Sequence, residues 1–128
     1  MNFMKNTALK VSYNDELCGY LAKFTNTSGK RLYMYKYVSE YIDKKYSRAI
    51  SWSLPIQNEP FYSEQLFGFF DNLLSEGWLR REQAKILNVS ESDSFSLLMQ
   101  NGADLPGAIT VIHDEQLSHL LEPYFQRA

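Results

Sequence analysis

The chain has 128 residues, a formal net charge of −2 and a pI of about 5.7, so it lacks the positive field that contacts with nucleic-acid phosphates usually leave in a sequence. Hydrophobic residues make up 45% of it, which excludes the composition of a disordered chain, and this length normally forms one domain around one core. No apolar run approaches the roughly 20 residues that cross a bilayer and no signal region opens the chain, so contact with a membrane is not expected. Because of its charge, the chain is not expected to contact nucleic acid directly either.

Alternation of apolar residues at every second position predicts three strands in the first third of the chain. They cover Ala8–Tyr13, Leu17–Phe24 and Leu32–Tyr37. Turn-forming residues separate them, with Asn14-Asp15 between the first two strands and the stretch 26–30 between the second and the third. Because both connections are short, we expect the three strands to form an antiparallel meander.

Two weaker patterns follow the third strand. Residues 39–46 have a mixed composition that is compatible with one short helical turn. Ala49–Leu54 predicts a fourth strand. This strand is expected to stop at Pro55, because proline offers no amide hydrogen to a sheet.

After residue 60 the apolar residues change to helical spacing. They recur at i, i+3, i+4, i+7 and i+8 from Leu66 to Leu74, and Ser63 is a candidate N-cap. The Glu76-Gly77 pair interrupts this pattern and allows a second helix to begin, which we place at Trp78–Leu87. The sequence therefore predicts two consecutive helices in this region.

The last third of the chain predicts a third helix, a strand and a terminal helix. The third helix has Ser92 or Ser94 as its N-cap and ends at Asn101-Gly102, since both residues tolerate a left-handed conformation. Ala108–Ile112 alternates as a strand does. The terminal helix would lie within residues 113–128, with Leu117, Leu120 and Leu121 as its apolar residues and an interruption at Pro123.

The order of these elements predicts an α+β fold. Strands come first, helices follow, and one more strand closes the chain, with no strand–helix–strand alternation that would indicate a parallel sheet. We expect a single domain, residues 1–128, in which an antiparallel sheet (the meander plus later strands) packs against a small set of helices on one face.

Residues able to do chemistry are few and scattered. No glycine-rich phosphate loop is present, and His113 and His119 lack the spacing of a metal pair. Cys18, the single cysteine, cannot form an internal disulfide and predicts a reducing compartment. Because the sequence shows no signal region and no apolar run long enough to cross a bilayer, we expect a cytoplasmic location. We therefore expect no catalytic residue, no cofactor and no metal, and a protein that is not an enzyme. A small enzyme that uses a carboxylate pair or Cys18 is a distant alternative.

Aromatic residues are abundant, with nine Tyr, eight Phe and two Trp. One core of this size cannot easily bury all of them, and Tyr and Trp are enriched in the energetic centres of protein interfaces. Plain packing explains the aromatic content equally well, so both interpretations stay open at this point.

Three segments in the same order resemble the N-terminal domain of the HipA-type serine/threonine kinases. They are S-W-S-L-P-I at Ser51–Ile56, F-F-D-N-L-L-S-E-G-W-L-R-R at Phe69–Arg81, and S-L-L-M-Q-N-G-A-D-L-P-G-A at Ser96–Ala108. Ser75 stands where the family commonly has proline. The resemblance covers about residues 8–113 and leaves 114–128 as a C-terminal extension that we expect to be helical. The residues that bind nucleotide and metal in such a kinase have no counterpart in this chain.

The resemblance implies a function through binding. A free-standing copy of this domain resembles HipS-type antitoxins, which belong to three-component HipBST-like toxin–antitoxin systems. The expected partners are a HipT-like kinase toxin, which the antitoxin would bind and neutralise, and a HipB-like helix-turn-helix protein in a ternary complex. The alternative is a scaffold or corepressor that links the kinase to its DNA-binding partner without blocking the active site.

The candidate partner-binding residues are aromatic anchors with charged neighbours. A tryptophan can act as a wedge in a cleft, and arginine can pair with acidic groups there. The candidates are Trp78, Arg80, Arg81, Glu76, Gly77 and Trp52. Trp78 follows a turn between two predicted helices, whereas Trp52 lies among the apolar residues of the predicted fourth strand, and a core position for either one is left open.

Overall fold

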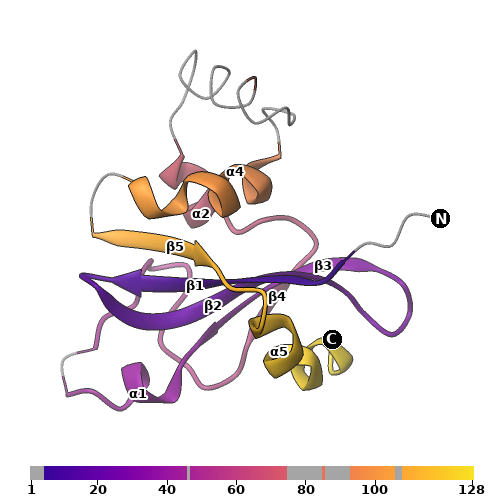
Figure 1. Ribbon diagram of the computed structural model, residues 1–128. Coiled ribbons are helices and arrows are strands. Elements are labelled where there is room, and N and C mark those ends of the chain that lie inside the picture. Colours follow the sequence, from indigo (N-terminus) through magenta and orange to yellow (C-terminus); the bar gives the residue numbers. More distant parts are fainter. Residues whose placement is uncertain (1–4, 46, 75–84, 86–92, 106–107) are drawn as a thin grey trace.

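The computed structural model describes residues 5–45, 47–74, 85, 93–105 and 108–128. The strands are β1 (Thr7–Tyr13), β2 (Glu16–Thr25), β3 (Arg31–Tyr37), β4 (Phe61–Ser63) and β5 (Ile109–His113). The helices are α1 (Ser39–Ile42), α2 (Gly68–Leu73), α4 (Ser94–Asn101) and α5 (Leu117–Gln126), and a 3-10 turn, η1, covers Gly102–Asp104. Figure 1 shows their arrangement.

The five strands form one antiparallel sheet in the order β4-β3-β2-β1-β5. The predicted meander of the first three strands is confirmed, with bounds that differ by one residue at most ends. The predicted closing strand is also present, as β5, and it pairs with β1 along its whole length. The α+β fold predicted from the sequence is therefore the fold of the protein.

Helices cover both faces of the sheet rather than one (Figure 1). On β3, Tyr35 and Tyr37 belong to the core under α2 and α4, whereas Leu32 and Met34 belong to a second core under α5. Because successive side chains of a strand point to opposite faces, an apolar residue at almost every position of β3 needs a cover on each side. The expectation of helices on one face was therefore wrong.

The predicted fourth strand, Ala49–Leu54, is not formed. Only Ser51 and Leu54 make a single antiparallel bridge with each other, across a tight turn. The free edge of β3 pairs instead with β4, which the sequence patterns did not indicate. Ile50 and Leu54 thus reach the core from a loop, because the place beside β3 is taken.

The starts of α2 and α4 differ from the predicted ones. Ser63 lies in β4, where its hydroxyl accepts a hydrogen bond from the backbone N–H of Gln65 at 3.1 Å, and α2 begins only at Gly68. The N-cap of α4 is Asp93, whose carboxylate accepts a hydrogen bond from Ser96 N–H at 3.2 Å. The predicted serine caps are therefore wrong, while the helical pattern that follows each of them is confirmed in position. The predicted helix Trp78–Leu87 lies outside the described residues except for Lys85.

The end of α4 depends on close packing rather than on a left-handed residue. α4 ends at Asn101 as predicted, but Gly102 has a right-handed φ of −63°. A Cβ atom at Gly102 would lie 2.2 Å from the carbonyl oxygen of Val111 in β5. Glycine is needed here because the chain passes directly against the sheet.

The terminal helix runs through Pro123 instead of stopping there. α5 extends to Gln126, and its buried residues Leu117, Leu121 and Phe125 follow a spacing of four. Packing of this stripe outweighs the one hydrogen bond that a proline removes from a helix. Leu120, which was assigned with Leu117 and Leu121 to the apolar residues of this helix, is 62% exposed. Within the described residues, no helix has the length and apolar character needed to cross a bilayer.

Candidate partner-binding surface

Trp52 lies at the tip of a tight turn and is 93% exposed. The backbone N–H of Leu54 donates to the carbonyl oxygen of Ser51 at 3.0 Å, which closes the turn around the tryptophan. The hydroxyl of Ser51 accepts from the N–H of Ser53 at 3.3 Å and lies 2.9 Å from the Ser53 hydroxyl. These local hydrogen bonds fix the backbone that carries the indole ring.

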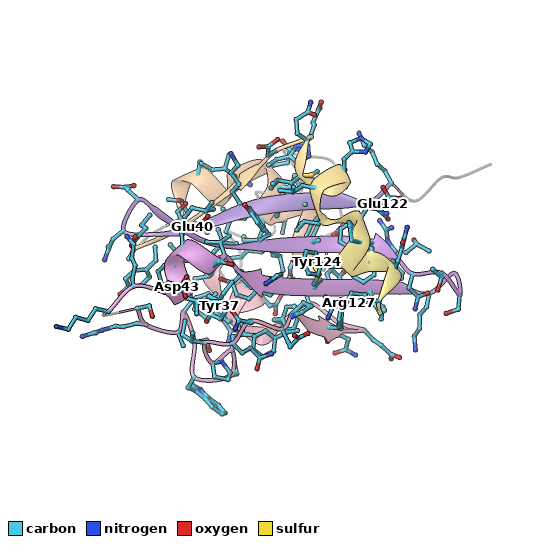
Figure 2. The ribbon with its side chains drawn as sticks, turned by 90° about the horizontal axis from the view of Figure 1, so that it is seen from below. Tyr37, Glu40, Asp43, Glu122, Tyr124 and Arg127 are labelled. Carbon is cyan, nitrogen blue, oxygen red and sulfur yellow. The ribbon has the colours of Figure 1, made fainter. Side chains whose placement is uncertain are left out.

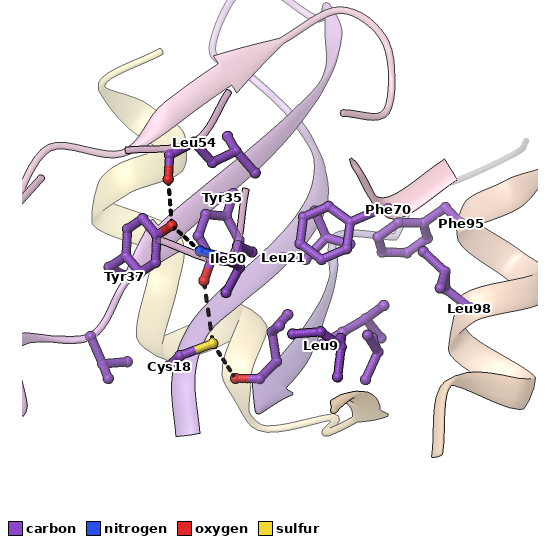
Figure 3. Close-up of a cluster of buried hydrophobic side chains, with 14 of the residues drawn as sticks. Leu9, Cys18, Leu21, Tyr35, Tyr37, Ile50, Leu54, Phe70, Phe95 and Leu98 are labelled. Atoms are coloured by element: carbon purple, nitrogen blue, oxygen red, sulfur yellow. Dashed lines mark hydrogen bonds between the residues drawn. The ribbon is translucent and has the colours of Figure 1, made fainter. Parts of the chain in front are cut away.

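A single buried hydroxyl holds both ends of this turn (Figure 3). The hydroxyl of Tyr37 accepts a hydrogen bond from the N–H of Ile50 at 3.0 Å and donates one to the carbonyl oxygen of Leu54. Ile50 and Leu54 are themselves buried in the core. Burial raises the pKa of Tyr37 to about 12, so the phenol stays protonated and can donate this hydrogen bond at neutral pH. The turn is thus anchored on each side of Trp52.

Neighbouring aromatic rings fix the position of Tyr37. Its ring is stacked on Tyr41 with centroids 6.0 Å apart and meets Tyr35 edge-on at 4.9 Å. A Cβ atom at Gly19 would lie 2.3 Å from the Tyr35 hydroxyl, so glycine in β2 makes room for that group. The Tyr35 hydroxyl lies 3.6 Å from the sulfur of Cys18, which donates to the carbonyl oxygen of Val11 at 3.3 Å. The anchor of the turn is therefore part of the packed sheet.

The groove beside Trp52 is formed by the turn and α2, with a volume of about 350 Å³. It is lined by Ser51, Trp52, Ser53, Gly68, Phe69, Asn72 and Leu73, and we name this set the Trp52 surface. Phe69 packs edge-on against the buried ring of Phe70, with centroids 5.2 Å apart. Two aromatic residues and a leucine beside a few polar groups are the composition of an interface centre.

Cys18, the candidate nucleophile of the enzyme alternative, is in a position unsuited to that role. It is fully buried, and burial raises the pKa of its thiol. The thiolate is the reactive form of cysteine, and a raised pKa disfavours it at neutral pH. In residues 5–45, 47–74, 93–105 and 108–128, no cluster of three His, Cys, Asp or Glu residues is arranged to hold a metal ion.

Of the residues predicted to bind a partner, Trp52 is the one that the structure describes. Trp78, Arg80, Arg81, Glu76 and Gly77 lie outside the described residues and stay predictions. The expectation that Trp52 sits among strand residues is corrected, because its segment is a turn. Phe69 and Leu73 were assigned only to the apolar stripe of a helix. The two serines around Trp52, just before Pro55, were the available signal for a turn.

Comparison with known proteins gives one consistent family. The family model described as the HipA N-terminal domain matches residues 9–112. A solved structure, "N-terminal domain of HipA toxin", superposes with a TM-score of 0.62 at 29% sequence identity, covering 91% of this chain and 99% of that one.

Curated relatives match over parts of the chain. An uncharacterized protein of Haemophilus influenzae is 39% identical over 67 residues, which are 52% of this chain and 63% of the relative. "Putative kinase Y4mE" of Sinorhizobium fredii is 33% identical over 82 residues, which are 64% of this chain and 20% of that protein. The chain therefore matches less than two thirds of the length of the first relative and only a fifth of the second.

Proposed function

Because the chain belongs to the HipA N-terminal domain family, we propose that it is the antitoxin of a three-component toxin–antitoxin system and neutralises a separate HipA-like serine/threonine kinase by direct contact. Membership in this family makes the chain a HipA-related toxin–antitoxin component, and the HipA N-terminal domain is a non-catalytic subdomain. A module of this kind acts through its surface, so the proposal depends on what that surface presents.

The observation that carries the proposal is the exposure of Trp52 on a fixed turn. A tryptophan side chain that is 93% exposed leaves a large apolar area in water, and burial of that area in a complex is favourable. Tryptophan is among the residues most enriched in interface hot spots. Because hydrogen bonds at both ends already order the turn, binding loses little conformational entropy.

The shape of the Trp52 surface favours a concave partner. The indole stands at the tip of a turn, with the groove that Phe69 and Leu73 line beside it. A protruding aromatic ring fits a cleft better than a flat surface, and the nucleotide-binding site of a kinase is such a cleft. We therefore propose that Trp52 enters the cleft of the kinase while the groove contacts the rim.

Replacement of Trp52 by alanine tests this assignment. With the purified kinase, W52A is expected to weaken binding by about 30-fold or more, because truncation of a hot-spot residue costs about 2 kcal/mol or more. Binding is measured by isothermal titration calorimetry, and rescue of growth from the kinase is measured in cells.

Leu120→Ala is the matched control, since Leu120 is an exposed apolar residue of α5. L120A should keep the wild-type affinity and rescue. If W52A folds as the wild type and binds the kinase equally well, Trp52 is not the anchor.

A kinase assay separates the antitoxin from the scaffold alternative. An antitoxin lowers phosphorylation by the purified kinase in proportion to occupancy, whereas a scaffold leaves it unchanged. We propose a HipB-like helix-turn-helix protein as the third component. Co-purification of the three proteins at a fixed stoichiometry tests that part of the proposal.

A further inference from the structure

A second, larger groove lies where the β1–β2 hairpin meets α1 and the loop that follows it. Its volume is about 580 Å³. Its lining is Tyr13, Asn14, Glu16, Tyr41, Lys44, Lys45, Ser47 and Arg48, and we name it the basic groove. Figure 2 labels Asp43 at the end of α1, where this loop begins. The groove is separate from the Trp52 surface, with which it shares no lining residue.

The charge of the basic groove is opposite to that of the whole chain. Three cationic side chains and one carboxylate line it, a local excess of two positive charges in a chain whose formal net charge is −2. Lys44 forms an ion pair with Glu16, which ties the loop to the hairpin. Arg48 is exposed and supplies a planar guanidinium that can bind an anion with two hydrogen bonds.

Hydrogen bonds between a tyrosine hydroxyl and the backbone of Arg48 hold one wall of the groove in place. The hydroxyl of Tyr41 donates to the carbonyl oxygen of Arg48 at 2.6 Å and accepts from its N–H at 3.4 Å. On the opposite side, Asn14 has a positive φ of 50° in a tight hairpin turn, and its N–H donates to the carbonyl oxygen of Ala108 at 2.9 Å. Both walls of the groove are therefore ordered before any ligand binds.

We propose that the basic groove binds a phosphorylated serine or threonine side chain of the partner protein. A phosphoryl group carries nearly two negative charges and three acceptor oxygens, which match several cationic and polar donors around one concave site. A serine/threonine kinase is the kind of partner on which such residues occur, so the identity of the partner rests on the proposed function. The binding of the phosphoryl group itself depends only on the groove.

The position of the groove allows it to act together with Trp52. Arg48 precedes Trp52 by four residues, and four residues span at most about 14 Å even when fully extended. A partner that buries the indole therefore comes within reach of the cationic loop. Occupation of the groove would add affinity for the phosphorylated form of the partner over the unphosphorylated form.

Titration of the full-length protein with phosphopeptides tests the groove without the kinase. The probe is a degenerate nonapeptide mixture with a central phosphoserine, and its partner mixture carries serine at that position. Backbone amide resonances of residues 13–16 and 41–48 are expected to shift with the phosphorylated mixture only. Arg48→Ala should weaken this binding at least tenfold, and R48K should lie between R48A and the wild type because it keeps the charge but loses the planar fork.

Lys30→Ala is the matched control for loss of one positive charge. Glu16 of the basic groove begins β2, and Lys30 follows the far end of this ten-residue strand, so Lys30 lies at the opposite end of the sheet. K30A should bind like the wild type.

The proposal is overturned by equal affinity for the two peptide mixtures or by unchanged binding in R48A. It is also overturned if inorganic phosphate shifts the same amides at the same concentration, or if duplex DNA binds the groove more tightly than the phosphopeptide. None of these outcomes depends on whether W52A still binds the kinase.

Discussion

The two faces of the sheet are closed by different kinds of core. The core under α2 and α4 contains buried hydroxyl and thiol groups, of which the Tyr37 hydroxyl bonds the loop that carries Trp52. The buried members of the core under α5 are alanine, leucine, methionine and phenylalanine. The first core thus fixes the position of a surface loop, while the second core contributes mainly burial of apolar area.

The two cores also differ in their relation to the family. The family match covers residues 9–112, and α5 (Leu117–Gln126) lies beyond it. The segment that closes the second core is therefore one that the family model does not include. In Figure 2, which views the sheet from the side that α5 covers, α5 lies in front of the strands, and Tyr124 and Arg127 are labelled there. We therefore expect that substitutions in the loop that carries Trp52 and substitutions in the helix that covers the opposite face act independently.

Phe125→Ala gives the largest expected effect on the second core. Phe125 is buried and its ring stacks on that of Phe24, with centroids 4.5 Å apart and planes at 13°. Removal of a buried phenyl ring typically costs about 3–5 kcal/mol of unfolding free energy. We expect a loss of this size for F125A, and urea denaturation measures it. Leu120→Ala on the same helix should change the stability by less than about 0.5 kcal/mol, because Leu120 is exposed.

The role assigned to α5 would be contradicted if F125A and L120A lowered the free energy of unfolding by the same small amount. That result would mean that α5 contributes little to the folded state and that the second face is stable without a cover. The loss of stability in F125A should leave the position of Trp52 unchanged in the molecules that remain folded. Binding of the kinase at a temperature well below unfolding checks this point.

Tyr37→Phe has the next largest effect and acts on the first core. The substitution removes one hydroxyl and leaves the N–H of Ile50 and the carbonyl oxygen of Leu54 without this partner. Loss of a partner for buried backbone groups costs about 1–3 kcal/mol. Y37F should also weaken binding of the kinase, because the turn around Trp52 is no longer held at its ends.

Tyr35→Phe is the control for removal of a phenol hydroxyl from the same core. The Tyr35 hydroxyl contacts the Cys18 sulfur, which keeps its hydrogen bond to the Val11 carbonyl oxygen when that hydroxyl is removed. We expect a loss of at most about 1 kcal/mol and normal binding of the kinase. Equal effects of Y35F and Y37F on binding would show that the anchor of the turn is not specific to Tyr37.

The sequence predicted those parts of the fold that depend on local patterns. The meander was predicted correctly because alternating residues such as Leu9 and Val11, and the turn residues between the strands, act over a few positions. The segment Ala49–Leu54 has the same strand-like composition, but its structure depends on which segment pairs with β3. That competition between distant parts of the chain is not visible in local periodicity.

The candidate surfaces show the same limit of local sequence patterns, which do not reveal how distant segments come together. The S-W-S-L-P-I motif is one of the three segments that indicated the family, and it contains Trp52, but only the turn geometry shows that the ring is exposed. From the sequence alone, the basic run with Arg48 cannot be told from a solvated face, which is the common case for isolated cations. The hairpin that completes the basic groove is about 30 residues earlier in the chain, so no sequence pattern joins the two.

The pH dependence of stability has the smallest expected effect of these tests, and it is the most selective for the Tyr37 hydroxyl in the first core. The pKa of Tyr37 is raised to about 12 by burial, while a tyrosine in the unfolded chain ionises near pH 10. The native state therefore retains a proton that the unfolded state releases, so the contribution of Tyr37 to stability is complete below pH 10 and is lost as pH rises toward 12.

Burial also raises the pKa of Tyr35, so the wild type alone does not isolate one residue. The difference in urea midpoint between wild type and Y37F should shrink between pH 10 and 12, and a constant difference over this range would contradict the role of the Tyr37 hydroxyl as a buried, protonated donor.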